Sequence, residues 1–98
     1  MSKYDYQNID DIIHSRIRLA IMAVLIAVDE AEFIYLREKV NATDGNLSVH
    51  LKKLEDAKYI TVKKSFEGRK PISHYKLSSG GRKAFEAYID SLEKLIKK

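Results

Sequence analysis

The sequence predicts a mainly α-helical domain with one small β-hairpin (an α+β fold), in the order helix, helix, helix, hairpin, helix. Three observations lead to this prediction. First, apolar residues recur at helical spacing in four stretches. Second, two strand-like stretches joined by a turn precede the last of them. Third, turn-forming residues separate the stretches. With 98 residues, of which 45% are apolar, the chain is large enough for one core, so residues 1–98 are expected to form a single domain. Residues 1–8 show no periodicity and are expected to form a loose arm.

The first helix is expected from Ile9 to Val28, with Asn8 or Asp10 placed to cap its start. Apolar residues follow one helix face along this stretch, and others, such as Ile12 and Leu19, lie outside that face. Such a wide apolar surface predicts a helix that is buried on two sides, by its own core and by a partner.

A polar break, Asp29 to Glu32, separates this helix from a short second helix, Phe33 to Val40. Asn41 is expected to end the second helix, because asparagine tolerates the left-handed conformation that often follows a helix. Thr43 or Asp44 is then placed to cap a third helix, which is expected to run to about Ala57. Two short helices joined by a tight turn are typical of a helix-turn-helix.

The third helix has an apolar face formed by Leu47, Leu51 and Leu54, with His50 at its border. Its other face carries short polar groups first and lysines later, whereas a helix that meets only solvent more often carries glutamate and lysine throughout. Short polar side chains can bond to base edges, Val49 can touch a thymine methyl group, and lysines can contact phosphates. The sequence therefore predicts DNA contact here, with plain solvation as the alternative, through Thr43, Gly45, Asn46, Ser48, Val49, Lys52 and Lys53.

The hairpin is predicted from a strand at residues 59–66, a turn at 67–71 and a returning strand at 72–77. Cationic side chains gather on the first strand and the turn, with only Glu67 opposing them. Arg69, next to Gly68 at the tip, is placed to enter a narrow minor groove, where the potential is most negative. The predicted DNA contacts are Lys63, Lys64, Arg69 and Lys70; the alternative is an edge hairpin that its lysines protect against aggregation.

The last helix is expected from Gly81 to about Ile96, capped by Ser78 or Ser79. Its apolar residues fall at the spacing of a short coiled-coil seam, and the last two turns extend beyond what so small a domain can cover. A homodimer is therefore predicted, with the first helix (about 9–28) and the last (about 79–96) at its interface; capping of the monomer's own core is the alternative. The interface residues are predicted to be Ile12, Leu19, Phe85, Tyr88, Ile89, Leu92, Leu95 and Ile96.

The net charge of +4 is distributed unevenly along the chain. Residues 1–45 carry a net −3, residues 46–76 a net +5 and residues 77–98 a net +2. The positive charge thus coincides with the third helix and the hairpin, where a polyanion would bind. A solvated lysine surface is the alternative interpretation of the same excess.

Several functional classes find no support in the sequence. Cysteine is absent, and the three histidines (His14, His50 and His74) fall on separate elements, so no catalytic group, metal site or cofactor is expected. No apolar run approaches the roughly 18 residues of a membrane span. The N-terminal residues lack the basic and then apolar order of a signal peptide, so a cytoplasmic protein without membrane partners is expected.

Four stretches together resemble the small single-domain winged helix-turn-helix transcriptional regulators related to the MarR and ArsR groups: Ile13–Ile21, Asp44–Glu55, Lys64–Pro71 and Gly81–Phe85. The resemblance implies a cytoplasmic, homodimeric protein that binds double-stranded DNA sequence-specifically. Lys58 departs from it, because such proteins usually have glycine after the recognition helix; a left-handed backbone there would cost on the order of 1 kcal/mol. The cysteines of metal-sensing relatives are also missing, so metal or redox sensing is not implied.

Two other functions stay open on the sequence. The same fold can serve as a protein-interaction module in a transcription-related assembly, with its basic face on an acidic protein. It can also be an effector-responsive regulator, which needs a small-molecule pocket at the dimer interface, between the first and last helices.

Overall fold

The computed structural model describes residues 6–97. A short 3-10 turn (η1, Tyr6–Asn8) precedes the first helix, so residues 6–8 are not an irregular arm, while residues 1–5 lie outside the described part. The elements that follow are α1 (Arg16–Ala27), β1 (Ala31–Glu32), α2 (Phe33–Val40), α3 (Asp44–Asp56), β2 (Ile60–Glu67), β3 (Lys70–Leu77) and α4 (Ser79–Ile96). The predicted mainly helical fold with one hairpin is confirmed.

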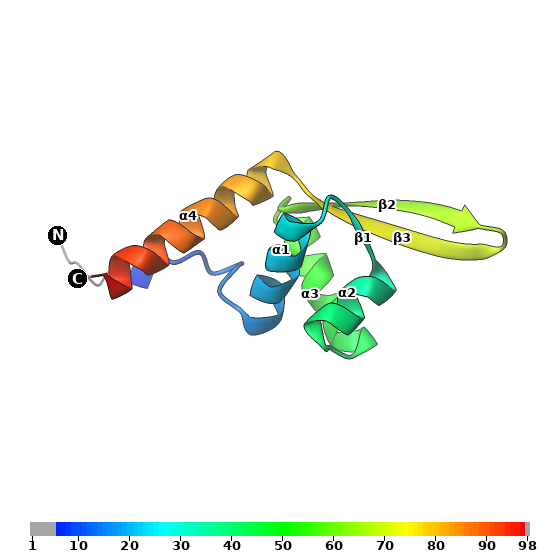
Figure 1. Cartoon of the computed structure of the whole chain (residues 1–98), viewed down its shortest axis with the longest axis horizontal. Helices are drawn as coiled ribbons and strands as arrows, with labels where there is room; N and C mark the ends of the chain where they lie inside the picture. Colours follow the sequence, from blue (N-terminus) through cyan, green and yellow to red (C-terminus); the bar gives the residue numbers. More distant parts are fainter. Residues whose placement is uncertain (1–5, 98) are drawn as a thin grey trace.

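The molecule is elongated, with extents of 56 × 25 × 21 Å. Figure 1 shows the reason: the β2–β3 hairpin and α4 project in opposite directions from a body made of α1, α2 and α3. The core lies between these helices and the inner end of the sheet, and it has no buried polar side chain among the described residues. Its fully covered side chains include Ile13, Ile21, Met22, Leu25, Leu36, Leu47, Leu54 and Ile60.

The first helix begins later than predicted, at Arg16 and not at Ile9. The carboxylate of Asp10 accepts the backbone N–H groups of Ile12 and Ile13 (2.8 and 3.0 Å), which folds this segment into a turn of its own. The hydroxyl of Ser15 then caps α1 by accepting the N–H of Arg18. Helical spacing of apolar residues on both sides of the turn concealed this break.

The turn is tied to the rest of the molecule. Asp10 also accepts a hydrogen bond of 2.6 Å from the hydroxyl of Tyr59, which together with burial raises the pKa of Tyr59 to about 12. His14 shares a hydrogen bond of 2.9 Å with the hydroxyl of Tyr88 in α4. The segment before α1 is therefore held against the residue that precedes β2 and against α4.

The sheet has a third strand that the sequence did not predict. Ala31 and Glu32, predicted as part of a polar break, form β1 and pair antiparallel with Tyr75 and His74 of β3. The strand order is β1-β3-β2. Two residues are too few to show alternation, so only the pairing itself reveals the strand.

The hairpin turn is tighter than predicted. Glu67 pairs with Lys70, so only Gly68 and Arg69 form the loop, and Pro71 belongs to β3. Gly68 has φ of 64°, the left-handed conformation that two-residue hairpin loops require at their first position. Because the strands run up to this loop, Arg69 lies at the outermost point of the hairpin.

The ends of the later helices follow the predicted capping residues. Asn41, with φ of 55°, ends α2, and Thr43 caps α3. Ser78 caps α4, which begins at Ser79 and so spans the range of about 79–96 expected for the interface helix. In the described part of the chain, no helix combines the length and the apolar character that crossing a membrane requires.

Candidate nucleic-acid interface

The third helix is seated by one face and free on the other. Leu47, Leu51 and Leu54 are buried in the core, as predicted. The opposite side, here called the outer face of α3, consists of Gly45, Asn46, Ser48, Val49, Lys52 and Lys53, and all six are exposed. Even the apolar Val49 is 54% exposed. The sequence prediction of this exposed set is therefore correct, and it leaves hydrogen-bonding and cationic groups available to a ligand.

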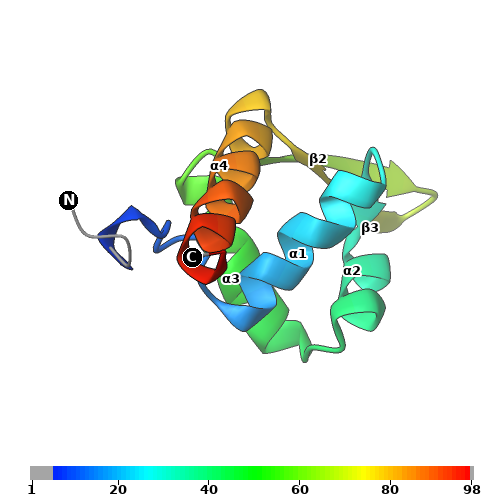
Figure 2. The same cartoon turned by 60° about the vertical axis from the view of Figure 1, so that its left-hand side comes forward.

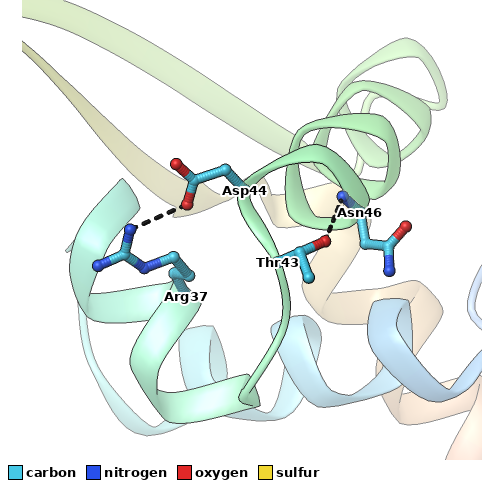
Figure 3. A network of polar contacts seen from close by, with 4 residues as sticks. All are labelled: Arg37, Thr43, Asp44 and Asn46. Carbon is cyan, nitrogen blue, oxygen red and sulfur yellow. Dashed lines mark hydrogen bonds and ion pairs between the residues drawn. The ribbon is translucent and has the colours of Figure 1, made fainter.

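Thr43 is the N-cap residue of this helix. Its hydroxyl accepts the backbone N–H of Asn46 at 3.1 Å, the bond drawn in Figure 3. The cap stabilises the first turn, the part of α3 that offers Asn46 and Ser48. Thr43 thus supports the outer face whether or not it touches a ligand itself.

Arg37 is a site residue that the sequence did not point to. Its guanidinium reaches from the last turn of α2 to the carboxylate of Asp44, 2.9 Å away, as Figure 3 shows. This hydrogen bond raises the pKa of Arg37. Asp44 would otherwise present an uncompensated negative charge beside the outer face, where it would repel a phosphate. This pair could not be predicted from the sequence, because its two residues lie on different helices, seven positions apart.

Arg18 holds the other side of α3. From α1 it donates hydrogen bonds to the carbonyl of Ile12 and to Nδ1 of His50, the latter at 2.8 Å. Burial, followed by the charges of Arg18 and Lys53, lowers the pKa of His50. Neutral His50 therefore accepts this hydrogen bond, which links α3 to α1.

The β2–β3 hairpin, here called the wing, stands beside the outer face of α3. Ser48 and Lys52 of α3 line a hollow of about 380 Å³ together with Val62 and Lys64 of β2 and Tyr75 of β3. The hollow joins the helix to the inner half of the wing. Leu51 and Glu55 of α3 line it as well, so polar, cationic, acidic and apolar groups of both elements meet on one surface.

The wing divides the four predicted cations between its two faces. Side chains alternate along a strand, so Lys64 shares the face of Val62, which borders α3, whereas Lys63 points to the opposite face. Arg69 lies in the tip loop and Lys70 begins β3. All four are exposed, but only Lys64 lines the hollow beside α3.

The cations of the site differ in how far they are already neutralised. Lys52 forms an exposed ion pair with Asp56, 3.0 Å away, and this hydrogen bond raises the pKa of Lys52. Within residues 6–97, none of Lys53, Lys64 and Arg69 forms an ion pair. Lys63 and Lys70 form none there either, so all five cations can exchange counterions for phosphates.

The three histidines do not come together in the described residues. Each histidine has a separate partner: Tyr88 for His14, Arg18 for His50 and Glu30 for His74. No group of three or more metal-ligating side chains occurs within residues 6–97. The exposed outer face of α3 and the wing remain the candidate site.

The predicted dimer residues differ in exposure. Phe85, Ile89, Leu92 and Ile96 recur every three or four residues along one flank of α4, and Ile89 and Ile96 are 38% and 77% exposed. Tyr88 differs from the prediction: it is only 3% exposed and bonded to His14, so it serves the core of its own chain. Figure 2 shows the molecule with the end of α4 turned towards the viewer. Ile12, Leu19 and Leu95 are half-buried.

A helix-turn-helix followed by an antiparallel hairpin, with the third helix exposed beside that hairpin, defines the winged-helix class of fold. Residues 17–96 match the family described as the winged helix DNA-binding domain. The chain therefore belongs to that family, and the predicted resemblance to small winged-helix regulators is confirmed.

Relatives show the same fold. The chain is 42% identical over 86 residues to an uncharacterized protein of Methanocaldococcus jannaschii, covering 88% of this chain and 94% of that one. It is similar to the structure of a transcriptional regulator homologue from Pyrococcus horikoshii OT3, with 24% identity, a TM-score of 0.88 and coverage of 99% and 96%. A MarR mutant from E. coli, solved in complex with operator DNA, has 16% identity and a TM-score of 0.67 over 89% and 64% of the two chains. Regulators of the ArsR family also share the fold.

Proposed function

We propose that this protein is a cytoplasmic transcriptional regulator that binds double-stranded DNA sequence-specifically as a homodimer. The outer face of α3 enters the major groove, and the wing contacts the backbone and the adjacent minor groove. The observation that carries the proposal is the shared hollow: Ser48 and Lys52 of α3 and Lys64 of the wing border one surface. The MarR mutant whose fold it shares was solved with operator DNA, which supports the same partner for this chain.

The division of labour follows from the chemistry of the side chains. Asn46 and Ser48 carry short groups that hydrogen-bond to base edges, so they are assigned sequence discrimination. Lys53 and Lys64 carry compact ammonium charges and are assigned phosphate contact, and Arg69 at the wing tip is assigned to the negative potential of the minor groove. Val49, exposed between them, is assigned to the methyl group of thymine.

Selection of bound duplexes from a random pool, followed by titration of the selected sequence at several salt concentrations, tests this function. The logarithm of the association constant is expected to fall by about 0.9 for each phosphate neutralised, per unit of log salt concentration. Arg69→Ala is expected to weaken binding to all sequences and to reduce this slope. Asn46→Ala is expected to alter the selected sequence.

Lys94→Ala serves as the matched control, because Lys94 lies on α4 and is paired with Asp90. It should leave affinity and selected sequence unchanged. If the wild-type protein retains no duplex at low salt, the protein-interaction module becomes the better account of the basic surface. If Arg69→Ala and Asn46→Ala weaken every sequence equally, the assigned roles are wrong.

A further inference from the structure

Phe66 is placed where a folded protein rarely leaves an aromatic ring. It lies near the outer end of β2 and is 74% exposed, compared with 40% for Tyr35. Across the hairpin it pairs with Pro71, so two apolar side chains stand together next to the tip loop. Neither residue has core to cover at this position, since the wing extends away from the body in Figure 1.

The ring faces the same side as the outer face of α3. Side chains alternate along β2, so Phe66 shares its face with Val62 and Lys64. Those two residues line the hollow that Ser48 and Lys52 of α3 complete. A ligand lying across α3 and the wing therefore meets Phe66 next after Lys64.

The surroundings of the ring are cationic. Lys64 precedes it on the same face, and Arg69 and Lys70 follow across the turn, against one acidic residue, Glu67, which pairs with Lys70. An acidic partner of any shape could neutralise these cations. The ring makes no hydrogen bond, however, so its partner must also offer an apolar surface between its negative charges. Double-stranded DNA offers that combination in the minor groove, where sugar and base surfaces lie between two rows of phosphates.

The spacing along the wing fits this groove. Phe66 lies four residues beyond Val62, or about 13 Å along the strand. When a helix occupies the major groove, the centre of the neighbouring minor groove is half a helical turn away, about 17 Å. The phosphate ridge between the grooves then falls near Lys64, and the ring reaches the edge of the minor groove.

We propose that Phe66, supported by Pro71, is an apolar contact of the wing with the minor groove beside the sequence that α3 reads. The inference rests on the proposed DNA-binding function and deepens it. Apolar wedges in a minor groove act where base steps unstack readily. Phe66 therefore contributes specificity for flanking pyrimidine–purine steps, which deform most easily, without reading any base by a hydrogen bond.

The test compares Phe66→Ala with Lys64→Ala on the same selected duplex over a range of salt concentrations. An apolar contact releases no counterion, so Phe66→Ala is expected to lower affinity by roughly tenfold, as for loss of one stacked aromatic, at an unchanged salt slope. Lys64→Ala is expected to lower the slope. Selection with Phe66→Ala should also lose the preference at flanking steps, and Phe66→Leu should retain most of the affinity.

Ile34→Ala is the control, because Ile34 is an exposed apolar residue (46%) that lines a separate cavity between α2 and β1. It should change neither affinity nor flanks. If Phe66→Ala binds with the affinity of the wild type and selects the same flanking base steps, the inference is overturned and the proposed function stays intact. A change in molecular mass on light scattering would overturn it too, by assigning the ring to a second copy. Failure of the wild-type protein to bind duplex would overturn both proposals.

Discussion

At Lys58 the backbone enters the left-handed region, with φ of 65°, directly after α3 has ended. The N–H of Tyr59 reaches the carbonyl of Leu54 (3.0 Å) and that of Lys58 reaches the carbonyl of Glu55 (2.9 Å), the paired bonds of a Schellman motif. The motif normally places glycine where Lys58 stands, because a Cβ atom is strained in this conformation. The strain anticipated from the sequence at this residue is therefore present.

Lys58→Gly should stabilise the protein by about 1 kcal/mol, since it removes that strain. Urea unfolding should show a higher midpoint at an unchanged slope. Lys58→Ala provides the control, because it removes the charge and keeps the Cβ atom. An equal gain from Lys58→Ala would mean that the charge, and not the conformation, is unfavourable.

Gly81 and Gly80 are adjacent but differ in what surrounds them. A Cβ atom on Gly81 would lie 1.9 Å from the carbonyl oxygen of Tyr59, whereas one on Gly80 would have no neighbour closer than 3.8 Å. Gly81→Ala should therefore destabilise the fold by about 1–3 kcal/mol, the usual cost of overpacking. Gly80→Ala should be neutral or slightly stabilising, because alanine favours helix. Thermal unfolding measures the stability of both variants. Equal melting temperatures for Gly81→Ala and Gly80→Ala would contradict this account.

His50 gives stability a defined dependence on pH. Burial and the neighbouring Arg18 hold its pKa below the unfolded value of about 6.5, so the unfolded chain binds a proton more readily than the folded one. His50 therefore contributes its full stability above about pH 6.5 and loses it as pH falls towards the lower, folded pKa. The free energy of unfolding of His50→Gln should fall less than that of the wild type between pH 7.5 and 5.5. Parallel curves for the two proteins would refute this role.

Among the elements, α2 and α3 are joined by more than the turn between them. The Arg37–Asp44 pair is exposed and screened by solvent, so its loss should have little effect on stability. Its effect on DNA should be larger, because Arg37→Ala leaves Asp44 uncompensated beside the outer face. A duplex-binding titration should show several-fold weaker binding for Arg37→Ala and little further effect of that change in an Asp44→Asn background. If the loss persists in that background, Arg37 contacts the phosphates directly.

The elements differ in how far they could be predicted. The leucine periodicity of α3, the alternation of β2 and the caps at Thr43 and Ser78 are local patterns, and each element carries its own. The start of α1 could not be placed, because the Asp10 turn keeps apolar residues at helical spacing across a break. β1 is too short to show a pattern and exists only through pairing with β3.

The candidate site divides in the same way. Exposure of the outer face of α3 follows from the position of its leucines, so those residues were predictable. The roles of Arg37 and Arg18 arise from contacts between elements, with Asp44 and His50, that no spacing along the chain reveals. The exposed Phe66 looked like an ordinary strand residue until the length of the wing beyond the body was known.

At the scale of the whole molecule, one flank of α4 is only partly covered: Phe85 and Leu92 pack against the core, whereas Ile89 and Ile96 are exposed. Ile89→Asp combined with Ile96→Asp should therefore convert a homodimer into monomers of 11.3 kDa, because a carboxylate at an apolar interface is costly to bury. Light scattering measures this directly. Both residues are exposed in the single chain, so the fold should persist by circular dichroism.

Ala87→Asp is the matched control for that variant, since Ala87 is exposed on another side of α4. It introduces the same charge without touching the flank and should leave the mass unchanged. A dimer that survives the double substitution would place the interface elsewhere. A dimer of the expected kind sets two copies of α3 about one DNA turn, or 34–36 Å, apart.

The junction of β3 and α4 has a mechanical consequence. A single residue, Ser78, separates strand from helix, and it is pinned to the carbonyls of Lys58 and Tyr59 by bonds of 2.7 and 3.0 Å. These bonds fix the direction in which α4 leaves the sheet, and the wing extends about 26 Å from this junction. In the proposed dimer, a small tilt between the paired α4 helices would be magnified into a change in the span between the two wing tips.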